Sequence, residues 1–172
     1  MAEASGYIYQ LNCSDGGVPK LPVREVLLTP TGLVGDRQAN PRFHGGPERA
    51  LCLYALEQIN ALRAEGHPIF PGSLGENITV AGLDWSSLAP GCRLALGDEV
   101  IIELSSYTAP CQNIKESFSD GKFKNISQKA RPGESRLYAR VIRTGLLAVG
   151  QEVRVLNGKT VEEIQANGSG RA

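Results

Sequence analysis

The residue best suited to chemistry is Cys111, which follows Pro110 where an apolar strand is expected to end and a short helix to begin. Backbone N–H groups at a helix N-terminus stabilise an anion, so this position favours the thiolate. A thiolate is a soft ligand for a heavy transition metal and also a nucleophile that can accept sulfur. The position therefore predicts metal ligation or sulfur transfer at Cys111; the alternative is a buried cysteine that only packs.

An anion-binding role is predicted for two residues in the glycine-rich stretch between residues 32 and 47. Arg37 ends the run Gly-Leu-Val-Gly-Asp-Arg, and His44 precedes Gly-Gly-Pro. Glycines let the main chain turn tightly beside a ligand. The planar donors of Arg37 suit phosphate or carboxylate, and His44 could donate to the same anion. The alternative is an exposed loop with an Asp36–Arg37 surface pair.

Polar side chains on two expected strands are further candidates. Asn77 enters a strand directly after a glycine turn, and its amide both donates and accepts, which suits the edge of a pterin. The alternative for Asn77 is capping of local backbone groups. Tyr138 and Arg140 lie on the same face of the expected strand Leu137–Arg143, where they could bring a hydroxyl and a cation to one pocket. The alternative is a solvated face.

Several other kinds of site are excluded by the sequence. Cys13, Cys52 and Cys92 are far apart, form no C-x-x-C pair and have only two histidines to supplement them, so a structural zinc site is not expected. The chain has no P-loop, no dinucleotide-binding G-x-G-x-x-G unit and no G-x-S-x-G elbow. A hydrolase that pairs Cys111 with His44 lacks any sequence sign of a third, orienting residue.

The elements that must position these residues are mostly strands. β-rich runs are expected at residues 7–12, 21–28, 49–54, 76–80, 99–104, 137–143, 146–149 and 152–156, with glycines and prolines mostly between them. Apolar residues at three-residue spacing predict a helix over Ala55–Glu65, and a shorter one is expected over Gln112–Phe118. The pattern predicts a mainly β fold: a single-domain, closed or nearly closed β-barrel with one or two short helices. This domain spans residues 1–156, and residues 157–172 form a partly disordered tail.

Composition agrees with a globular protein and limits its partners. A length of 172 residues suits one domain, and 18 basic residues balance 18 acidic ones, so neither nucleic acid nor an anionic membrane is expected as the obligate partner. No apolar run is long enough to cross a bilayer, and the first six residues do not resemble a signal peptide. We therefore expect a cytoplasmic protein with free thiols.

Taken together, the order of the short motifs resembles the MOSC domain, which is named for the C-terminal part of molybdenum cofactor sulfurases. The resemblance covers about residues 7–156 and is carried by Gly35-Asp36-Arg37, His44-Gly45-Gly46, Gly75-Glu76-Asn77-Ile78, Gly97-Asp98, Pro110-Cys111 and Tyr138-Ala139-Arg140-Val141. It implies a barrel similar to that of pyruvate kinase, with Cys111 as the ligand of molybdenum in a pterin-based cofactor (molybdopterin). It also implies that Arg37, His44, Asn77, Tyr138 and Arg140 line the cofactor site. At the family level it brings an association with pyridoxal phosphate. Ala109 departs from the basic or bulky residue that many members carry before Pro-Cys.

The leading hypothesis from this resemblance is a molybdenum-dependent reductase of N-hydroxylated compounds. Its electrons would come from a separate donor protein, because the chain has no flavin or iron–sulfur signature. The second hypothesis is a sulfur carrier that receives sulfur from a donor as a persulfide on Cys111. The third is a non-catalytic module that binds the cofactor.

Overall fold

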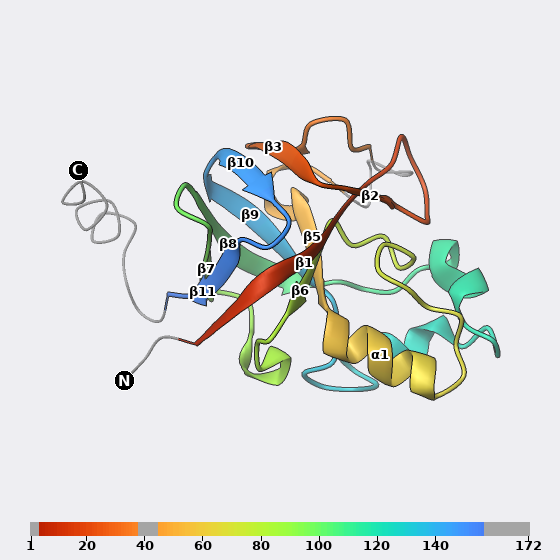
Figure 1. Ribbon diagram of the computed structural model, residues 1–172. Helices are drawn as coiled ribbons and strands as arrows, with labels where there is room; N and C mark the ends of the chain where they lie inside the picture. The colour runs from red at the N-terminus through yellow and green to blue at the C-terminus, as the bar shows by residue number, and fades with distance from the viewer. Residues whose placement is uncertain (1–3, 38–44, 157–172) are drawn as a thin grey trace.

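Seven strands close into a barrel in the computed structural model of the protein, which describes residues 4–37 and 45–156 (Figure 1). Around the barrel the order is β11, β7, β8, β9, β5, β6 and β1, and β1 pairs again with β11. These strands are β1 (Ser5–Cys13), β5 (Leu51–Ala55), β6 (Ile78–Ala81), β7 (Arg93–Leu96), β8 (Val100–Tyr107), β9 (Leu137–Arg143) and β11 (Glu152–Val155).

Further short strands extend the barrel at one side. β2 (Leu21–Val23) pairs with β1, while β3 (Glu25–Thr29) lies between β10 (Gly145–Ala148) and β4 (Gly32–Leu33) in a separate three-stranded sheet. The expected single run at 21–28 is therefore two strands. The reason is that its two halves pair with partners in different sheets, β1 for β2 and β10 for β3.

An odd number of strands imposes at least one parallel pair on this barrel. In a closed ring the number of antiparallel neighbours must be even, so seven strands cannot all be antiparallel. The parallel pair is β5 with β6, and α1 (Leu56–Ala64) lies between them in the chain. A parallel pair needs a crossover connection, which a helix commonly provides. The one α-helix of the described residues thus follows from the way the barrel closes.

β5 and β6 are buried on both faces, which explains why their sequences do not alternate between polar and apolar residues. Every residue of both strands is buried. Ile59 and Leu62 of α1 are buried in the same core cluster as the residues of these strands. Continuous apolar runs are typical of strands covered on both sides.

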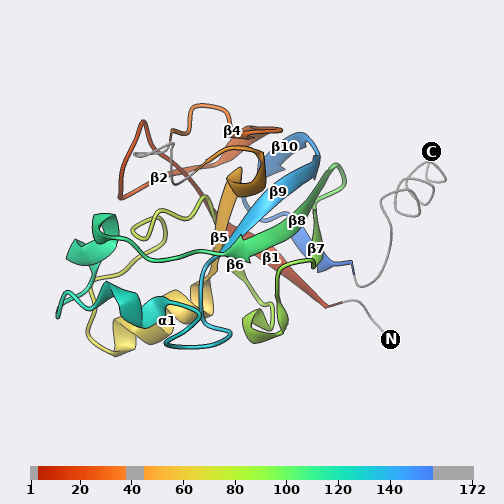
Figure 2. The same ribbon diagram turned by 180° about the vertical axis from the view of Figure 1, so that it is seen from behind.

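Short 3-10 helices complete the structure: η1 (Pro47–Arg49), η2 (Trp85–Ser87), η3 (Gln112–Ser117) and η4 (Phe123–Ile126). Both ribbon views place α1, η3 and η4 together on the side of the molecule opposite β7 and β11 (Figures 1 and 2). No helix among the described residues combines the length and apolarity needed to cross a membrane.

The predicted mainly β barrel with one or two short helices is confirmed. The helix expected at 55–65 is α1, and the one expected at 112–118 is the 3-10 helix η3. β7 was not expected, and it pairs with β8 through a hairpin that turns at Gly97. The tail at 157–172 lies outside the described residues.

Replacement of Gly72 tests how tightly the turn before β6 is packed. A Cβ at Gly72 would collide with the carbonyl oxygen of Lys20, and the φ of Gly72 is 91°. We expect Gly72→Ala to lower the free energy of unfolding by at least about 3 kcal/mol, because it adds a steric clash to left-handed strain. Gly91 has a similar φ, 98°, but open space around it, so Gly91→Ala should cost only about 1 kcal/mol. Equal losses in urea unfolding would contradict this.

Candidate functional site

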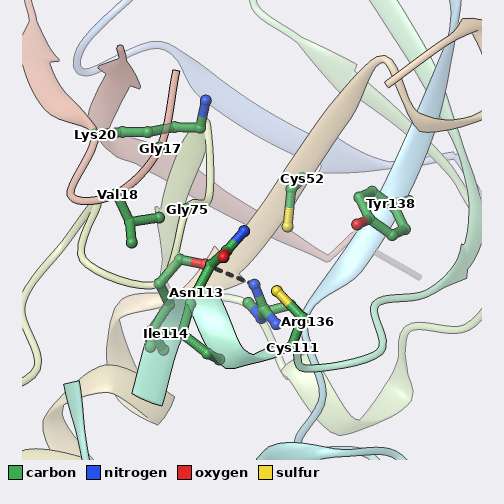
Figure 3. A pocket seen from close by; sticks show the side chains of 11 residues that line it. Gly17, Val18, Lys20, Cys52, Gly75, Cys111, Asn113, Ile114, Arg136 and Tyr138 are labelled. Carbon is green, nitrogen blue, oxygen red and sulfur yellow. Dashed lines mark hydrogen bonds between the residues drawn. The ribbon is translucent and has the colours of Figure 1, made fainter. Parts of the chain in front are cut away.

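An open pocket lies where β5, β9 and three loops meet (Figure 3). It encloses about 470 Å³ of empty space, which includes its solvent-open mouth. β5 and the start of β9 form one wall, the segment before β2 and the turn before β6 form another, and η3 closes the third. The lining residues are Gly17, Val18, Lys20, Cys52, Leu74, Gly75, Cys111, Asn113, Ile114, Arg136 and Tyr138.

Cys111 supplies a partly exposed thiol to this pocket. It is the residue before η3, in extended conformation, and its side chain points into the pocket toward Arg136 (Figure 3). Cys52 and Tyr138 point into the same space from the opposite wall. They are Cα partners in the β5–β9 pairing, and directly opposed residues project to the same face of a sheet. Two of the predicted site residues, Cys111 and Tyr138, are therefore brought together.

A buried cation, Arg136, lies beside the Cys111 side chain in the pocket and is the main candidate residue that sequence reasoning missed (Figure 3). Its residue is 5% exposed, and Nη1 donates to the Leu74 carbonyl at 2.6 Å. Its Nε is buried and has no hydrogen-bond partner among the described residues. Because an unpaired buried donor is costly, an anionic group in the pocket would stabilise this arrangement. A sequence signal exists: Arg136 is two residues before Tyr138, and such positions share a strand face.

A second buried cation, Lys20, is neutralised within the protein. Its Nζ lies 2.6 Å from Asp36 Oδ1, and the two side chains are 3% and 5% exposed. The Lys20 amine points away from the thiols in Figure 3. Asp36 Oδ1 also accepts from the Ser14 backbone N–H, and Oδ2 accepts from Asn77. In the Gly-Asp-Arg motif, the aspartate rather than the arginine is tied into the pocket wall.

Asn77 is buried, and its side-chain amide is engaged by protein partners. Its Oδ1 accepts from the Cys52 backbone N–H at 3.0 Å, and Nδ2 donates to Asp36 and to the Asn12 carbonyl. It is not among the lining residues. Asn77 thus fixes the backbone of Cys52, which does line the pocket, and a direct cofactor contact stays a prediction.

The other predicted ligands lie elsewhere or outside the described residues. Arg37 is 73% exposed in its side chain and pairs with Asp15 at 3.3 Å. Arg140 donates to Glu103 at 2.7 Å, and Glu103 also accepts from Arg93. Neither arginine lines the pocket. His44 falls in 38–44, outside the described residues. Cofactor binding by these three residues therefore stays a prediction.

Burial keeps the phenol and the second thiol of the pocket protonated. Burial raises the pKa of Tyr138, with the neighbouring cysteines adding to the rise, so the phenol is a hydrogen-bond donor at neutral pH. Burial also raises the pKa of the Cys52 thiol above its usual value of 9.0, against the opposing charge of Arg136. The Arg49 guanidinium lies 5.5 Å from the centre of the Tyr138 ring.

The donor set fits an anionic group that carries a soft atom. The protein offers one thiol at the mouth, one buried guanidinium and one neutral phenol, all facing the same space. Among the described residues, no three His, Cys, Asp or Glu side chains are placed together to hold a metal ion. The pocket can therefore bind a negatively charged ligand and present a sulfur atom to it.

Comparison with known proteins identifies the family of the chain that forms this pocket. The family model of the MOSC domain matches residues 40–154. This chain belongs to the MOSC domain family. Among solved structures, YiiM of Geobacillus stearothermophilus has a TM-score of 0.70 at 20% identity, covering 94% of this chain and 82% of that one. YiiM of Escherichia coli has a TM-score of 0.64 at 26% identity, covering 94% and 76%.

Relatives in sequence are longer than this MOSC protein. YflK of Bacillus subtilis is 29% identical over 143 residues, which cover 82% of this chain and 63% of YflK. YiiM of Escherichia coli is 32% identical over 108 residues, which cover 60% and 48%. A protein of Gibberella moniliformis named a reductase is 29% identical over 135 residues, 76% of this chain and 24% of its own length. The chain thus spans between about half and two thirds of YiiM and YflK.

Removal of the charge on Asp36 tests the wall of the pocket. We expect Asp36→Asn to lower the free energy of unfolding by about 3–5 kcal/mol, because it leaves the buried Lys20 ammonium without its counter-charge. Asp15→Asn removes the partner of exposed Arg37 and should cost no more than about 1 kcal/mol. Chemical denaturation of both variants measures the difference. A loss for Asp36→Asn as small as that for Asp15→Asn would contradict the assigned role.

Glu76 predicts a dependence of stability on pH. Burial raises the pKa of its carboxyl from 4.5 to about 7, although the Gly72 N–H and the Arg136 charge oppose the rise. Between these pH values the folded protein holds a proton that the unfolded chain releases, so stability falls as pH rises. Glu76→Gln cannot ionise and lacks this fall. Its stability relative to wild type should increase by on the order of 2–3 kcal/mol from about pH 5 to about pH 8. A pH-independent difference in urea unfolding would refute the raised pKa.

Proposed function

We propose that this MOSC protein binds the molybdenum cofactor and reduces N-hydroxylated small molecules. The single observation that carries the proposal is the pocket in which the Cys111 thiol faces a buried guanidinium whose Nε has no hydrogen-bond partner in the described part of the chain. A molybdenum cofactor is both anionic and thiophilic, so it suits this combination. Membership of the MOSC family and the relative named a reductase support the same class of activity.

Each pocket residue has a role in this proposal. Cys111 is the thiolate ligand, at the partly exposed mouth where a substrate has access. Arg136 offsets negative charge from beneath, and Tyr138 donates a hydrogen bond from its protonated phenol. Asn77 and Asp36 fix the pocket walls through their hydrogen bonds to Cys52 and Lys20, respectively. When bound, the cofactor supplies oxygen-atom transfer, and the protein orients it and limits water access.

The proposal also specifies where electrons come from. The chain has no flavin or iron–sulfur signature, so a separate donor protein must reduce the site. We place the reaction in the cytoplasm, where the four cysteines stay reduced. Nucleic acid and membrane have no part in it.

A sulfur carrier is the second candidate, and the second thiol favours it. Cys52 lines the same pocket as Cys111, and a metal ligand does not need such a neighbour. In this candidate Cys111 takes a sulfur atom as a persulfide and passes it to an acceptor. A non-catalytic cofactor-binding module would use the same residues as the reductase without turnover.

Molybdenum quantification on protein made in a molybdenum-replete host tests the proposal. We expect near-stoichiometric molybdenum in the wild-type protein. In Cys111→Ser the molybdenum content should be at least about tenfold lower, because the thiolate ligand is lost. Cys92→Ser is the matched control, since Cys92 does not line the pocket, and it should keep its molybdenum. Equal molybdenum in wild type and Cys111→Ser would rule out this ligand. Reduction of a hydroxylamino base with an artificial electron donor then separates the reductase from the non-catalytic module.

A further inference from the structure

We propose that Cys52 is the resolving thiol of Cys111: it attacks a persulfide carried on Cys111, forms a disulfide between the two residues and releases hydrosulfide. The inference deepens the sulfur-carrier candidate and rests on it. It adds an activity, the release of sulfur in its reduced form, and assigns a function to a cysteine that sequence reasoning placed among small buried hydrophobes.

The first support is that the two thiols share one pocket but come from unrelated elements. Cys52 is held in β5 by pairing with β9, and Cys111 is in the irregular segment between β8 and η3. Both side chains point into the same space in Figure 3. Cys52 Sγ lies 3.6 Å from Thr108 Oγ1, and Thr108 is only three residues before Cys111. The Thr108 N–H donates to the Arg136 carbonyl at 2.9 Å, so the fixed Cys52 thiol lies beside the last residue that is tied to β9 before the irregular segment that carries Cys111.

The second support is the division of exposure between the two cysteines. Cys111 is partly exposed and can meet an incoming sulfur donor, whereas Cys52 is only 5% exposed and can be reached only from within the pocket. Its burial protects the Cys52 thiol from external reagents. The reaction partner that it can reach is the persulfide on Cys111, in the same pocket. Cys13 and Cys92 do not line the pocket.

The third support is Arg136, which is charged and buried and whose Nε has no hydrogen-bond partner within residues 4–37 and 45–156. A persulfide is anionic at neutral pH, and Arg136 lines the pocket with both thiols. The guanidinium can hold the terminal sulfur as it gains charge and leaves. Packing alone would not require a buried cation in a pocket that two thiols line.

The step balances in atoms and electrons. The sulfur of Cys52 bonds to the Sγ of Cys111, the bond from Cys111 Sγ to the terminal sulfur breaks, and that sulfur leaves with the electron pair. The proton of the Cys52 thiol ends on the departing hydrosulfide. The two cysteines are oxidised to a disulfide, and the carried sulfur is reduced. A low-molecular-weight thiol then returns the disulfide to two thiols by exchange.

The experiment loads purified full-length protein with sulfane sulfur from sodium tetrasulfide, removes the reagent and follows hydrosulfide release. Wild type should release one equivalent and become lighter than the reduced protein by two hydrogen atoms, with a cross-link between tryptic peptides 50–63 and 94–115. Cys52→Ala should instead keep one extra sulfur atom on Cys111 and release hydrosulfide at least about tenfold more slowly. Cys52→Ser is a second variant of closer volume, and Cys92→Ala is the matched control expected to behave as wild type.

Each outcome decides the matter. If the lifetime of the persulfide on Cys111 is the same in wild type as in the Cys52→Ala and Cys52→Ser variants, the inference is overturned, and the sulfur-carrier candidate itself is unaffected. Failure of Cys111 to take up sulfur in every folded variant overturns both. Release of hydrosulfide with a cross-link to Cys13 or Cys92 also overturns the role of Cys52. Circular dichroism of each variant establishes that it is folded before loading.

Discussion

The carboxylate of Asp36 is the buried charge on which the walls of the pocket depend. It binds the Lys20 ammonium at 2.6 Å, accepts from the backbone after β1, and accepts from the amide of Asn77 at the start of β6. Asn77 in turn binds the backbone of Cys52. One side chain thus fixes the positions of three segments that are distant in sequence. Two charges out of water are tolerated here because they pair with each other and because Asp36 accepts two further hydrogen bonds, from the Ser14 N–H and from Asn77.

Barrel closure places the remaining pocket residues. β5 lies between β6, the next strand in the chain and its parallel partner, and β9, which comes more than 80 residues later. That position brings Cys52 opposite Tyr138 and leaves Arg136, two residues earlier, on the same face. The segment after β8 then runs along this face and places Cys111 in the pocket. The chemistry of the site therefore follows from topology as much as from the identity of its residues.

The balance of charge distinguishes the two cations of the pocket. Lys20 is neutralised by Asp36, whereas Arg136 donates to a carbonyl and its Nε finds no partner among the residues that the structure describes. Only the second cation is available to a ligand. Glu76, buried nearby with a pKa raised to about 7, is largely neutral at low pH and does not fully offset it. The positive charge beside two thiols is the feature that any proposed ligand must match.

The sequence by itself determined the fold class and the helix α1, and it singled out Cys111 as the candidate reactive residue, because each depends on local pattern. Hydrophobic alternation, apolar spacing and a Pro-Cys pair at a strand end are all visible within a few residues. It could not determine which polar residues face the pocket. Arg37 and Arg140 looked like ligands, yet both bind carboxylates away from it, while Lys20, Cys52 and Arg136 line it. That choice depends on which strand pairs with which and on long-range ion pairs such as Lys20–Asp36. Only the tertiary structure decides it, since a charge has no fixed partner until the chain has folded.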